Sequence, residues 1–475
     1  MKKAIRIVAG ILAIFAHSEV LASRPNIVLI MADDLGYGSV GFNGSKKIKT
    51  PQLDRMAKEG MRLDAMYAAS SVCGPSRASL MFGQHLGHCK IRGNPKWSLK
   101  SFQGLGTVDV EETDRLLPAY LKEAGYATGC FGKWGLNENR KTDAGHPNKH
   151  GFDEFWGLNT HMEAHFHWPD YVWHNSEKID LGSKGKNWRE KRVYGDALFT
   201  EKCIDFIETQ ADANKPFFAY LALTAPHLGN SVPKEYRELY EDENWPFIPT
   251  VKKHYRHDDG QNEAYAGMIS HTDAMVGLVR EKLEALGISE NTLVLFTSDN
   301  GQEWGQGFFN KESPFRGGKR SLNEGGIRMP SLAWWPGTVK AGSVSDQPLA
   351  FWDMMPTFCE LVGTAAPEDT DGISFVPLLT GKEMQNKHDV LFWYFNEAAG
   401  PMVAVRFGKW KAIRRWDKNK NNFASLSLYD LSLDPAEKTD LAGRYPEVSE
   451  KAAAYMKKEW VEDPNFPQVM LLREK

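Results

Sequence analysis

Three unbroken apolar segments, each followed by polar side chains, constrain the fold of this 475-residue chain more than any other feature. They cover residues 26–31, 217–223 and 292–296. Segments of this length without alternating polarity are typical of strands that are buried on both faces, as in a parallel sheet. Because ligands of such sheets bind at the carboxyl ends of the strands, the polar groups that follow the segments are expected to form a site.

Helical patterns lie between these strands. They cover residues 51–59, 116–123, 196–208 and 263–286. The first follows Thr50, which is expected to act as its N-cap. Strands that alternate with helices predict an α/β fold with a large doubly wound sheet, mixed but mostly parallel, flanked by helices.

The pattern changes after residue 385. Short strand-like segments joined by polar turns precede a helical segment, at residues 391–395, 403–407, 410–413, 427–429 and 448–459. They predict a small antiparallel sheet packed with a C-terminal helix. We therefore expect a main domain over residues 23–385 and a C-terminal subdomain over residues 386–475.

The first 22 residues have the features of a signal peptide. A basic start precedes an apolar run at residues 7–16, which is too short to span a bilayer, and small residues precede a cleavage point after Ala22. No later segment has about 18 consecutive apolar residues. The mature chain is therefore expected to be periplasmic or secreted, without a membrane segment.

The net charge of −3 gives no reason to expect nucleic acid as a partner. The cysteines are odd in number and scattered, which makes a poor disulfide framework, and they form no CxxC pair. They are Cys73, Cys89, Cys130, Cys203 and Cys359. One of the five therefore needs a separate explanation.

Carboxylates follow two of the predicted strands. Asp33 and Asp34 come after the first, and Asp299 and Asn300 come after the third. Adjacent carboxylates repel each other unless a cation or a cap stabilises them, so a turn or an N-cap is the alternative for the first pair. Hard oxygen ligands of this kind suit Ca²⁺ or Mg²⁺ rather than zinc.

Cys73 opens the segment Cys-Gly-Pro-Ser-Arg. If Pro75 is the first residue of a helix, Cys73 lies at the helix N-terminus, where free N–H groups and the dipole favour an anion. Arg77, one turn later, can face the same site. The pattern indicates an activated thiolate, and a buried structural cysteine is the alternative.

Three further side chains are candidates for the same site. Lys133 and Lys319 each follow glycine, which lets the backbone approach a ligand closely, although a lone lysine is usually a solvated surface residue. His227 comes after the second strand and could donate a proton, although a lone histidine there is more often structural.

Residues 73–77 resemble the C-x-P-S-R motif that defines the type I sulfatases of the alkaline-phosphatase-like superfamily. Residues 25–36, 126–134, 297–301 and 324–330 are also similar to segments of that family, in the same order. The resemblance covers nearly the whole mature chain. It implies an alkaline-phosphatase-like fold, with residues 23–385 as the catalytic domain.

In that family a maturation enzyme oxidises the motif cysteine to formylglycine (3-oxoalanine). The resemblance implies one calcium ion bound by Asp33, Asp34, Asp299, Asn300 and matured Cys73. It further implies that the hydrate of residue 73 is the nucleophile. The remaining roles would be stabilisation of the hydrate by Arg77, binding of sulfate oxygens by Lys133 and Lys319, and protonation of the leaving oxygen by His227.

Gly135 departs from the family pattern, which commonly has a histidine two residues after the signature lysine. That histidine is a candidate base for the elimination of sulfate. Our hypothesis is that His161, His165 or His167 reaches the site instead. Water as the base is one alternative, and a stretch that only shapes the substrate pocket is another.

Two other classes of protein remain open from the sequence. One is a phosphodiesterase or phosphonate hydrolase of the same superfamily, and the other is a non-catalytic carbohydrate-binding descendant, to which Gly135 gives slight support. Export and the 15 Trp residues favour a sulfated sugar or oligosaccharide as the substrate. A galactose- or N-acetylgalactosamine-type sulfate, attacked at a chain end, is our expectation.

Overall fold

The computed structural model describes residues 24–94, 109–138, 142–182, 193–247, 261–397, 400–420 and 422–463. The predicted signal peptide, residues 1–22, lies outside the described residues. Within those ranges no helix is long and apolar enough to cross a membrane.

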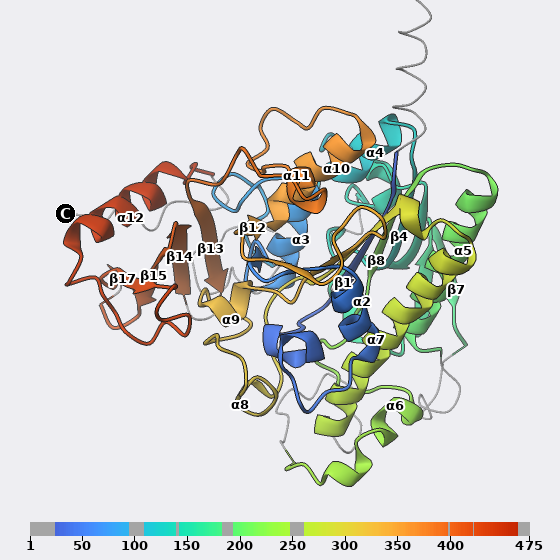
Figure 1. Cartoon of the computed structure of the whole chain (residues 1–475), viewed down its shortest axis with the longest axis horizontal. Helices are drawn as coiled ribbons and strands as arrows, with labels where there is room; N and C mark the ends of the chain where they lie inside the picture. The colour runs from blue at the N-terminus through green and yellow to red at the C-terminus, as the bar shows by residue number, and fades with distance from the viewer. Residues whose placement is uncertain are drawn as a thin grey trace, which may run out of the picture.

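A ten-stranded mixed sheet runs through the molecule (Figure 1). Its strand order is β11-β2-β10-β9-β1-β8-β4-β5-β6-β7. Its five central strands are parallel, which confirms the predicted doubly wound, mostly parallel sheet. They are β9 (Thr292–Ser298), β1 (Asn26–Ala32), β8 (Phe217–Ala222), β4 (Ala127–Lys133) and β5 (Glu154–Leu158). The three apolar segments of the sequence are therefore neighbours, with β1 between the other two.

Shorter strands extend the sheet at both ends and introduce antiparallel pairings. They are β2 (Met61–Leu63), β6 (Tyr171–His174), β7 (Glu177–Asp180), β10 (Leu332–Trp334) and β11 (Ser343–Ser345). A separate two-stranded parallel sheet pairs β3 (Met66–Tyr67) with β12 (Leu349–Ala350).

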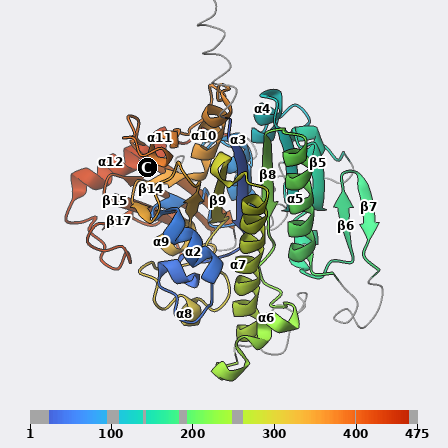
Figure 2. The same ribbon diagram turned by 45° about the vertical axis from the view of Figure 1, so that its right-hand side comes forward.

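Both faces of the sheet are covered, because alternate residues of β1 enter two different apolar cores. Ile27, Leu29 and Met31 belong to the core with α3 (Cys73–Phe82), α4 (Leu117–Glu123) and α10 (Met354–Val362). The residues between them pack with α2 (Pro51–Glu59), α5 (Gly195–Asp212) and α7 (Gln261–Ala285). Figure 2 shows α5 and α7 running side by side across that second face. Every residue of β1 is buried, as its unbroken apolar sequence predicts.

Two details at helix starts differ from the sequence predictions. Thr50 precedes α2 but makes no capping bond, because its hydroxyl is engaged with Asp54 Oδ1 and the Gly41 N–H. Pro75 is the third residue of α3 rather than the first, and Cys73 is the first. A proline is tolerated throughout the first turn, because N–H groups there have no intrahelical partner.

The C-terminal part forms the predicted small antiparallel sheet with a helix. Its elements are β13 (Leu391–Glu397), β14 (Gly400–Phe407), β15 (Trp410–Asp417), β16 (Asn422–Phe423), β17 (Ser427–Asp430) and α12 (Pro446–Lys458). Its apolar side chains belong to the same core as α3 and α10. Trp393 Nε1, for example, donates to the Ala68 carbonyl at 2.9 Å.

Short helices complete the described chain. They are α6 (Lys234–Glu238), α8 (Gln306–Phe309), α9 (Glu324–Ile327) and α11 (Val376–Leu379). The loop between β9 and α9 contains α8 and carries Lys319.

Candidate active site at the carboxyl edge of the sheet

Four neighbouring parallel strands bring polar residues to one edge of the sheet. Asp33 and Asp34 follow β1, Asp299 follows β9, Lys133 is the last residue of β4, and His227 lies in the loop after β8. Because the strands are parallel and adjacent, their carboxyl ends lie side by side. The predicted site residues are therefore brought together, as the strand pattern indicates.

The loops after β1 and β9 are joined directly by their polar groups. The Asp34 N–H donates to Asp299 Oδ1 at 3.1 Å, and Asn300 Nδ2 donates to Asp34 Oδ1 at 2.7 Å. Asp34 has a φ of +67°, a left-handed conformation that aspartate tolerates better than most residues. All of these side chains are buried.

Three cationic side chains contact the carboxylates. Lys133 Nζ lies 2.5 Å from Asp33 Oδ2, and Lys319 Nζ lies 2.7 Å from Asp34 Oδ2. Arg77 places Nε and Nη2 at 2.9 and 2.8 Å from Asp299 Oδ2. Each carboxylate thus has its own buried cation, and the ion pairs are shielded from water.

Burial and neighbouring charges oppose each other at these carboxylates. Burial raises the pKa of Asp34 to about 7, although Lys319 opposes it. Burial also raises the pKa of Asp299 well above its usual value, with Asp33 adding to the effect. Burial acts on Asp33 too, but Lys133 and His227 hold its pKa well below the usual range. Additional positive charge here would favour the ionised form of all three.

Two oxygens of this cluster are still available for a cation. Asp33 Oδ1 and Asn300 Oδ1 are buried, and neither has a hydrogen-bond partner among the described residues. Ligand atoms of Asp33, Cys73 and Asp299 lie within 4.8 Å of one another. Buried oxygens without partners are costly unless they bind an ion or water. The residues therefore fit a hard divalent cation such as Ca²⁺.

Cys73 is distinguished from the other cysteines by its surroundings. All five are buried and none forms a disulfide. Burial raises the pKa of the thiols of Cys89, Cys130, Cys203 and Cys359. Burial has the same effect on Cys73, but Lys133, His161 and Lys319 reverse it and hold its pKa well below the usual value. Cys73 is thus the thiol with anion-stabilising neighbours.

Arg77 is fixed from several sides. Besides its pairing with Asp299, its Nη1 donates to the Lys133 carbonyl at 2.9 Å and to the Tyr220 hydroxyl at 3.3 Å. It lies four residues after Cys73 on α3, on the same helix face. The guanidinium therefore cannot swing away from residue 73.

The loop after β8 holds His227 in a defined orientation. Its Nδ1 lies 3.1 Å from the Leu228 carbonyl, and its Nε2 lies 3.7 Å from Asp34 Oδ2. Asp196 on α5 anchors this loop by accepting the N–H groups of Thr224 and Ala225. Burial, reinforced by Lys319, lowers the pKa of His227 well below its usual value.

The three histidines of the aromatic-rich stretch take different places. His165 stacks on His227 with ring centroids 5.0 Å apart, and His167 uses both ring nitrogens to bind Thr224 Oγ1 and the His227 carbonyl. His161 lies beside Cys73 and interacts with its thiol. Of the three, His161 is therefore the one next to residue 73.

Several polar residues of the site rim had no signal in the sequence. Arg320 pairs with Glu303 at 2.8 Å and with Glu397 at 3.5 Å. Asn94 Nδ2 donates to Glu397 Oε1 at 2.9 Å, while its Oδ1 accepts the N–H of Gly74. Glu397 ends β13, so the C-terminal antiparallel sheet reaches the site. Only tertiary contacts place it there, and no local pattern could have identified it.

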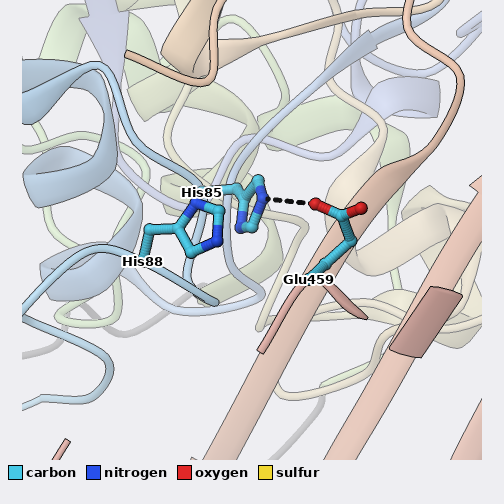
Figure 3. A group of neighbouring side chains, drawn as sticks. All are labelled: His85, His88 and Glu459. Atoms are coloured by element: carbon cyan, nitrogen blue, oxygen red, sulfur yellow. Dashed lines mark ion pairs between the residues drawn. The ribbon is translucent and has the colours of Figure 1, made fainter. Parts of the chain in front are cut away.

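A second group of histidine and carboxylate side chains lies beyond the other end of α3 (Figure 3). Atoms of His85, His88 and Glu459 that could bind a metal lie within 4.8 Å of one another. The Gly87 N–H donates to His85 Nδ1 at 3.0 Å, so the ring hydrogen of the neutral imidazole is on Nε2, which faces Glu459 at 3.4 Å. A metal ion would need that Nε2 lone pair. The group instead joins the C-terminal segment to the loop after α3 through hydrogen bonds, with Asp371 bound to His88 at 2.7 Å.

Three cations and their three carboxylates surround one nucleophilic side chain at the sheet edge, so a bound divalent cation would make the site positive. Such an arrangement binds anions and stabilises charge that develops on their oxygens. The fold and the site together define a hydrolase of anionic esters built on a doubly wound α/β sheet.

Comparison with known proteins identifies the family. The Sulfatase family model matches residues 25–364, and the model "N-sulphoglucosamine sulphohydrolase, C-terminal" matches residues 315–462. The chain belongs to the sulfatase family and is a sulfuric ester hydrolase, which confirms the resemblance seen in the sequence.

Relatives and solved structures agree with this assignment. N-acetylgalactosamine-6-sulfatase of Mus musculus is 33% identical over 82% of this chain and 71% of its own length. Arylsulfatase G of Rattus norvegicus is 30% identical over 91% of this chain and 85% of its own. The structure of Ps i-CgsB in complex with k-i-k-neocarrahexaose has a TM-score of 0.76 at 28% identity, and the match covers 92% of this chain and 93% of that one.

Proposed function

We propose that this sulfatase cleaves sulfate esters of a sugar, using a formylglycine made from Cys73 and one bound calcium ion. Asp33, Asp34, Asp299 and Asn300 hold the ion together with residue 73. The observation that carries the proposal is the placement of Cys73. It lies beside the buried cations Arg77, Lys133 and Lys319 and beside the carboxylates of Asp33 and Asp299. The other four cysteines have no comparable surroundings.

When present, these groups supply two hydroxyls on one carbon and a divalent charge beside them. The protein's own residues orient and neutralise the reactants. Arg77 is immobilised by Asp299, the Lys133 carbonyl and Tyr220, so its guanidinium stays beside residue 73. Lys133 and Lys319 both act on residue 73 through their charge, and they bind the sulfate oxygens as negative charge builds up on them.

His227 protonates the leaving oxygen. Its Nδ1–H donates to the Leu228 carbonyl, so Nε2 is the atom that takes up and then transfers the catalytic proton. The stacked ring of His165 and the anchored loop keep that orientation. The negative charge of a bound sulfate would raise the pKa of His227 from its low value in the free site, which couples protonation of this histidine to substrate binding.

A sugar suits the rim of the site. Arg320, Glu397 and Asn94 offer charged and amide groups that can read hydroxyls around an anchored sulfate. The relative named N-acetylgalactosamine-6-sulfatase and the neighbour bound to k-i-k-neocarrahexaose support a saccharide. We propose a galactose- or N-acetylgalactosamine-type sulfate, cleaved at a chain end.

The domain organisation belongs to the same proposal. Residues 23–385 carry the chemistry, and residues 386–475 contribute Glu397 to the rim. The enzyme is exported to the periplasm or beyond the cell after removal of residues 1–22. Amino-terminal sequencing of the mature protein would reveal cleavage after Ala22, and an intact Met1 in the exported protein would contradict it.

The experiment uses the full chain produced with and without a formylglycine-generating maturation enzyme. Peptide mass spectrometry measures conversion at residue 73, and sulfate release is measured on 4-nitrophenyl sulfate and on a panel of sulfated monosaccharides and oligosaccharides. Activity should follow the converted fraction and should need Ca²⁺. Matched phosphate and phosphonate esters should react more slowly.

Two serine variants provide matched controls. Cys73→Ser should lose multiple turnover, since serine has one hydroxyl, whereas Cys203→Ser, at a buried thiol away from the site, should keep it. Full activity with an unmodified thiol at position 73 would refute the formylglycine proposal. Faster hydrolysis of the phosphonate esters than of every sulfate ester would favour the phosphonate hydrolase alternative.

A further inference from the structure

Gly135 leaves room for another side chain beside residue 73. Its φ of +71° lies in the left-handed region, and a Cβ at this position would lie 3.1 Å from His161 Cε1 and 3.5 Å from His161 Nε2. A side chain at position 135 would therefore begin in the space next to the imidazole of His161. The absence of one allows His161 to occupy this place.

His161 is held there by one carboxylate. Its backbone N–H and its Nδ1 both bind Glu138 Oε1, at 2.6 and 3.0 Å. Because the carboxylate accepts the Nδ1 hydrogen, the lone pair of the neutral ring is on Nε2. Glu138 thus sets both the orientation and the tautomer of His161.

The ring of His161 lies against the reacting residue, and Nε2 is the ring nitrogen that Glu138 leaves unbound. His161 is 8% exposed, and its Nε2 is buried with no hydrogen-bond partner of good geometry among the described residues. The ring also packs against Gly74, where a Cβ would lie 3.2 Å from Cε1 and 3.4 Å from Nε2. The imidazole is therefore enclosed between Gly74 and Gly135, and the Cys73 thiol is the group with which it interacts.

The neighbouring histidines cannot take this position. Both ring nitrogens of His167 are already bound to Thr224 and to the His227 carbonyl. His165 stacks on His227, on the leaving-group side of the proposed reaction.

We propose that His161 is the catalytic base of the second half of the reaction, in which the sulfate transferred from the substrate to residue 73 is eliminated, and that Glu138 is its positioning residue. This inference rests on the proposed function. His161 Nε2 accepts the proton of a hydroxyl on residue 73. The electron pair of that O–H bond becomes the second C–O bond of the aldehyde, and sulfate departs with the electron pair of the bond that joined its oxygen to the same carbon.

The test uses the full-length enzyme produced with the maturation enzyme. His161→Gln removes the base, Glu138→Gln removes the carboxylate, and His174→Ala alters a histidine of β6 that stacks on Trp156. Conversion at residue 73 is measured in every preparation by peptide mass spectrometry. Rates are then expressed per converted chain, so that poor maturation is not mistaken for poor catalysis.

A base of the second half of the reaction gives a specific kinetic signature. In His161→Gln, kcat on 4-nitrophenyl sulfate should fall by roughly 10²- to 10⁴-fold, the usual contribution of general base catalysis. The ratio kcat/KM, which reports steps up to loss of nitrophenol, should change much less. A burst of one nitrophenol per converted chain should precede the slow phase. Intact mass after acid quenching should show substrate-derived sulfur retained on the variant but not on the wild type.

Glu138→Gln should change the same parameters in the same direction by a smaller factor, and His174→Ala should change none of them.

A second pair of variants tests the geometry. Gly135→Ala should lower kcat by pushing the His161 ring aside, and it should have no further effect in the His161→Gln background. This non-additivity would not arise from two independent losses of stability.

Different results separate this inference from the proposed function. Normal conversion with wild-type kcat in His161→Gln would overturn the role of His161 alone. Equal losses in kcat and kcat/KM without a burst would also overturn it, because His161 would then act before nitrophenol leaves. An active wild-type enzyme without conversion at residue 73 would overturn the proposed function and this inference together.

Discussion

Lys411 joins the C-terminal sheet to the catalytic part through buried charges. It lies on β15, and its Nζ is 2.8 Å from Glu324 Oε1 and 3.1 Å from Glu437 Oε1. All three side chains are fully buried. The substitution Lys411→Met keeps a long unbranched side chain and removes the charge. Breaking a buried ion pair from one side costs about 3–5 kcal/mol, because the partners stay buried without compensation.

The pKa of Glu324 depends on the same neighbouring cations. Burial would raise it, but Lys411, supported by Arg328 and Arg406, lowers it from 4.5 to about 2. That difference corresponds to about 3 kcal/mol of folding free energy. Because the pKa is depressed, the contribution is complete above about pH 5 and is lost as the pH falls toward 2.

Chemical unfolding at pH 7 would compare the wild type with Lys411→Met and Lys409→Met. Lys409 is the matched control, because it lies on the same hairpin and pairs with Asp430 at 2.7 Å, but its side chain is 53% exposed. Lys409→Met should cost less, about 1 kcal/mol, because the lysine is half exposed and the buried Asp430 keeps its hydrogen bonds from Ser432. Lys411→Met should cost about 3 kcal/mol.

Acidification adds a second criterion. Without Lys411 the pKa of Glu324 should rise, so protonation would relieve the buried charge at a higher pH than in the wild type. The deficit of Lys411→Met should therefore shrink between pH 7 and pH 4. Equal costs for the two lysine variants, or a deficit that grows on acidification, would refute the argument that the buried carboxylates depend on Lys411.

Three further outcomes are expected. Gly132→Ala should destabilise the protein by about 3 kcal/mol or more, because φ is +108° and a Cβ would lie 2.0 Å from the Ala222 carbonyl oxygen. Gly125→Ala is the control, because φ is +91° but the space around a Cβ is open, and it should cost about 1 kcal/mol in the same unfolding assay. Arg77→Lys should lower kcat/KM on 4-nitrophenyl sulfate by roughly 10²-fold or more, in preparations with normal conversion of residue 73. The reason is that an ammonium cannot bind Asp299, the Lys133 carbonyl and Tyr220 together. A kcat/KM within threefold of wild type would contradict this. Chelation should lower the melting temperature and Ca²⁺ should restore it, because the ion binds only the folded cluster. Asp33→Asn should abolish this response. An unchanged effect of Ca²⁺ on the melting temperature of that variant would contradict the proposed ligand set.

The sheet edge could be predicted because its signal is local. Asp33, Asp34, Asp299 and Asn300 directly follow buried apolar strands, and parallel strands end at a common edge. Lys133 ends β4 for the same reason. Lys319 lies in a loop, where the preceding glycine was only a weak signal, and its role came from the resemblance to the family. The start of α3 was misplaced by two residues, because a proline fits anywhere in a first helical turn.

The rim of the site could not be predicted, because its contacts join distant parts of the chain. Asn94 and Glu397 are 303 residues apart and still share a hydrogen bond. His161 was one of three candidates, and the choice among them depends on Glu138 and on the space beside Gly135. No periodicity or short motif records either relation.

The site is therefore divided between two kinds of structure. In the proposed function, residues at the strand ends and on α3 act on the ester itself, and all of them come from the doubly wound sheet or the helices on its faces. Arg320, on the rim, connects the two groups. It pairs with Glu303, a partner of Lys319, and with Glu397 of the C-terminal sheet. A change of Glu397 can alter the groups offered to the sugar without moving the strand ends. Substitutions on the C-terminal sheet should accordingly change KM and the choice of sugar more than kcat, whereas substitutions at the strand ends should change kcat for every ester.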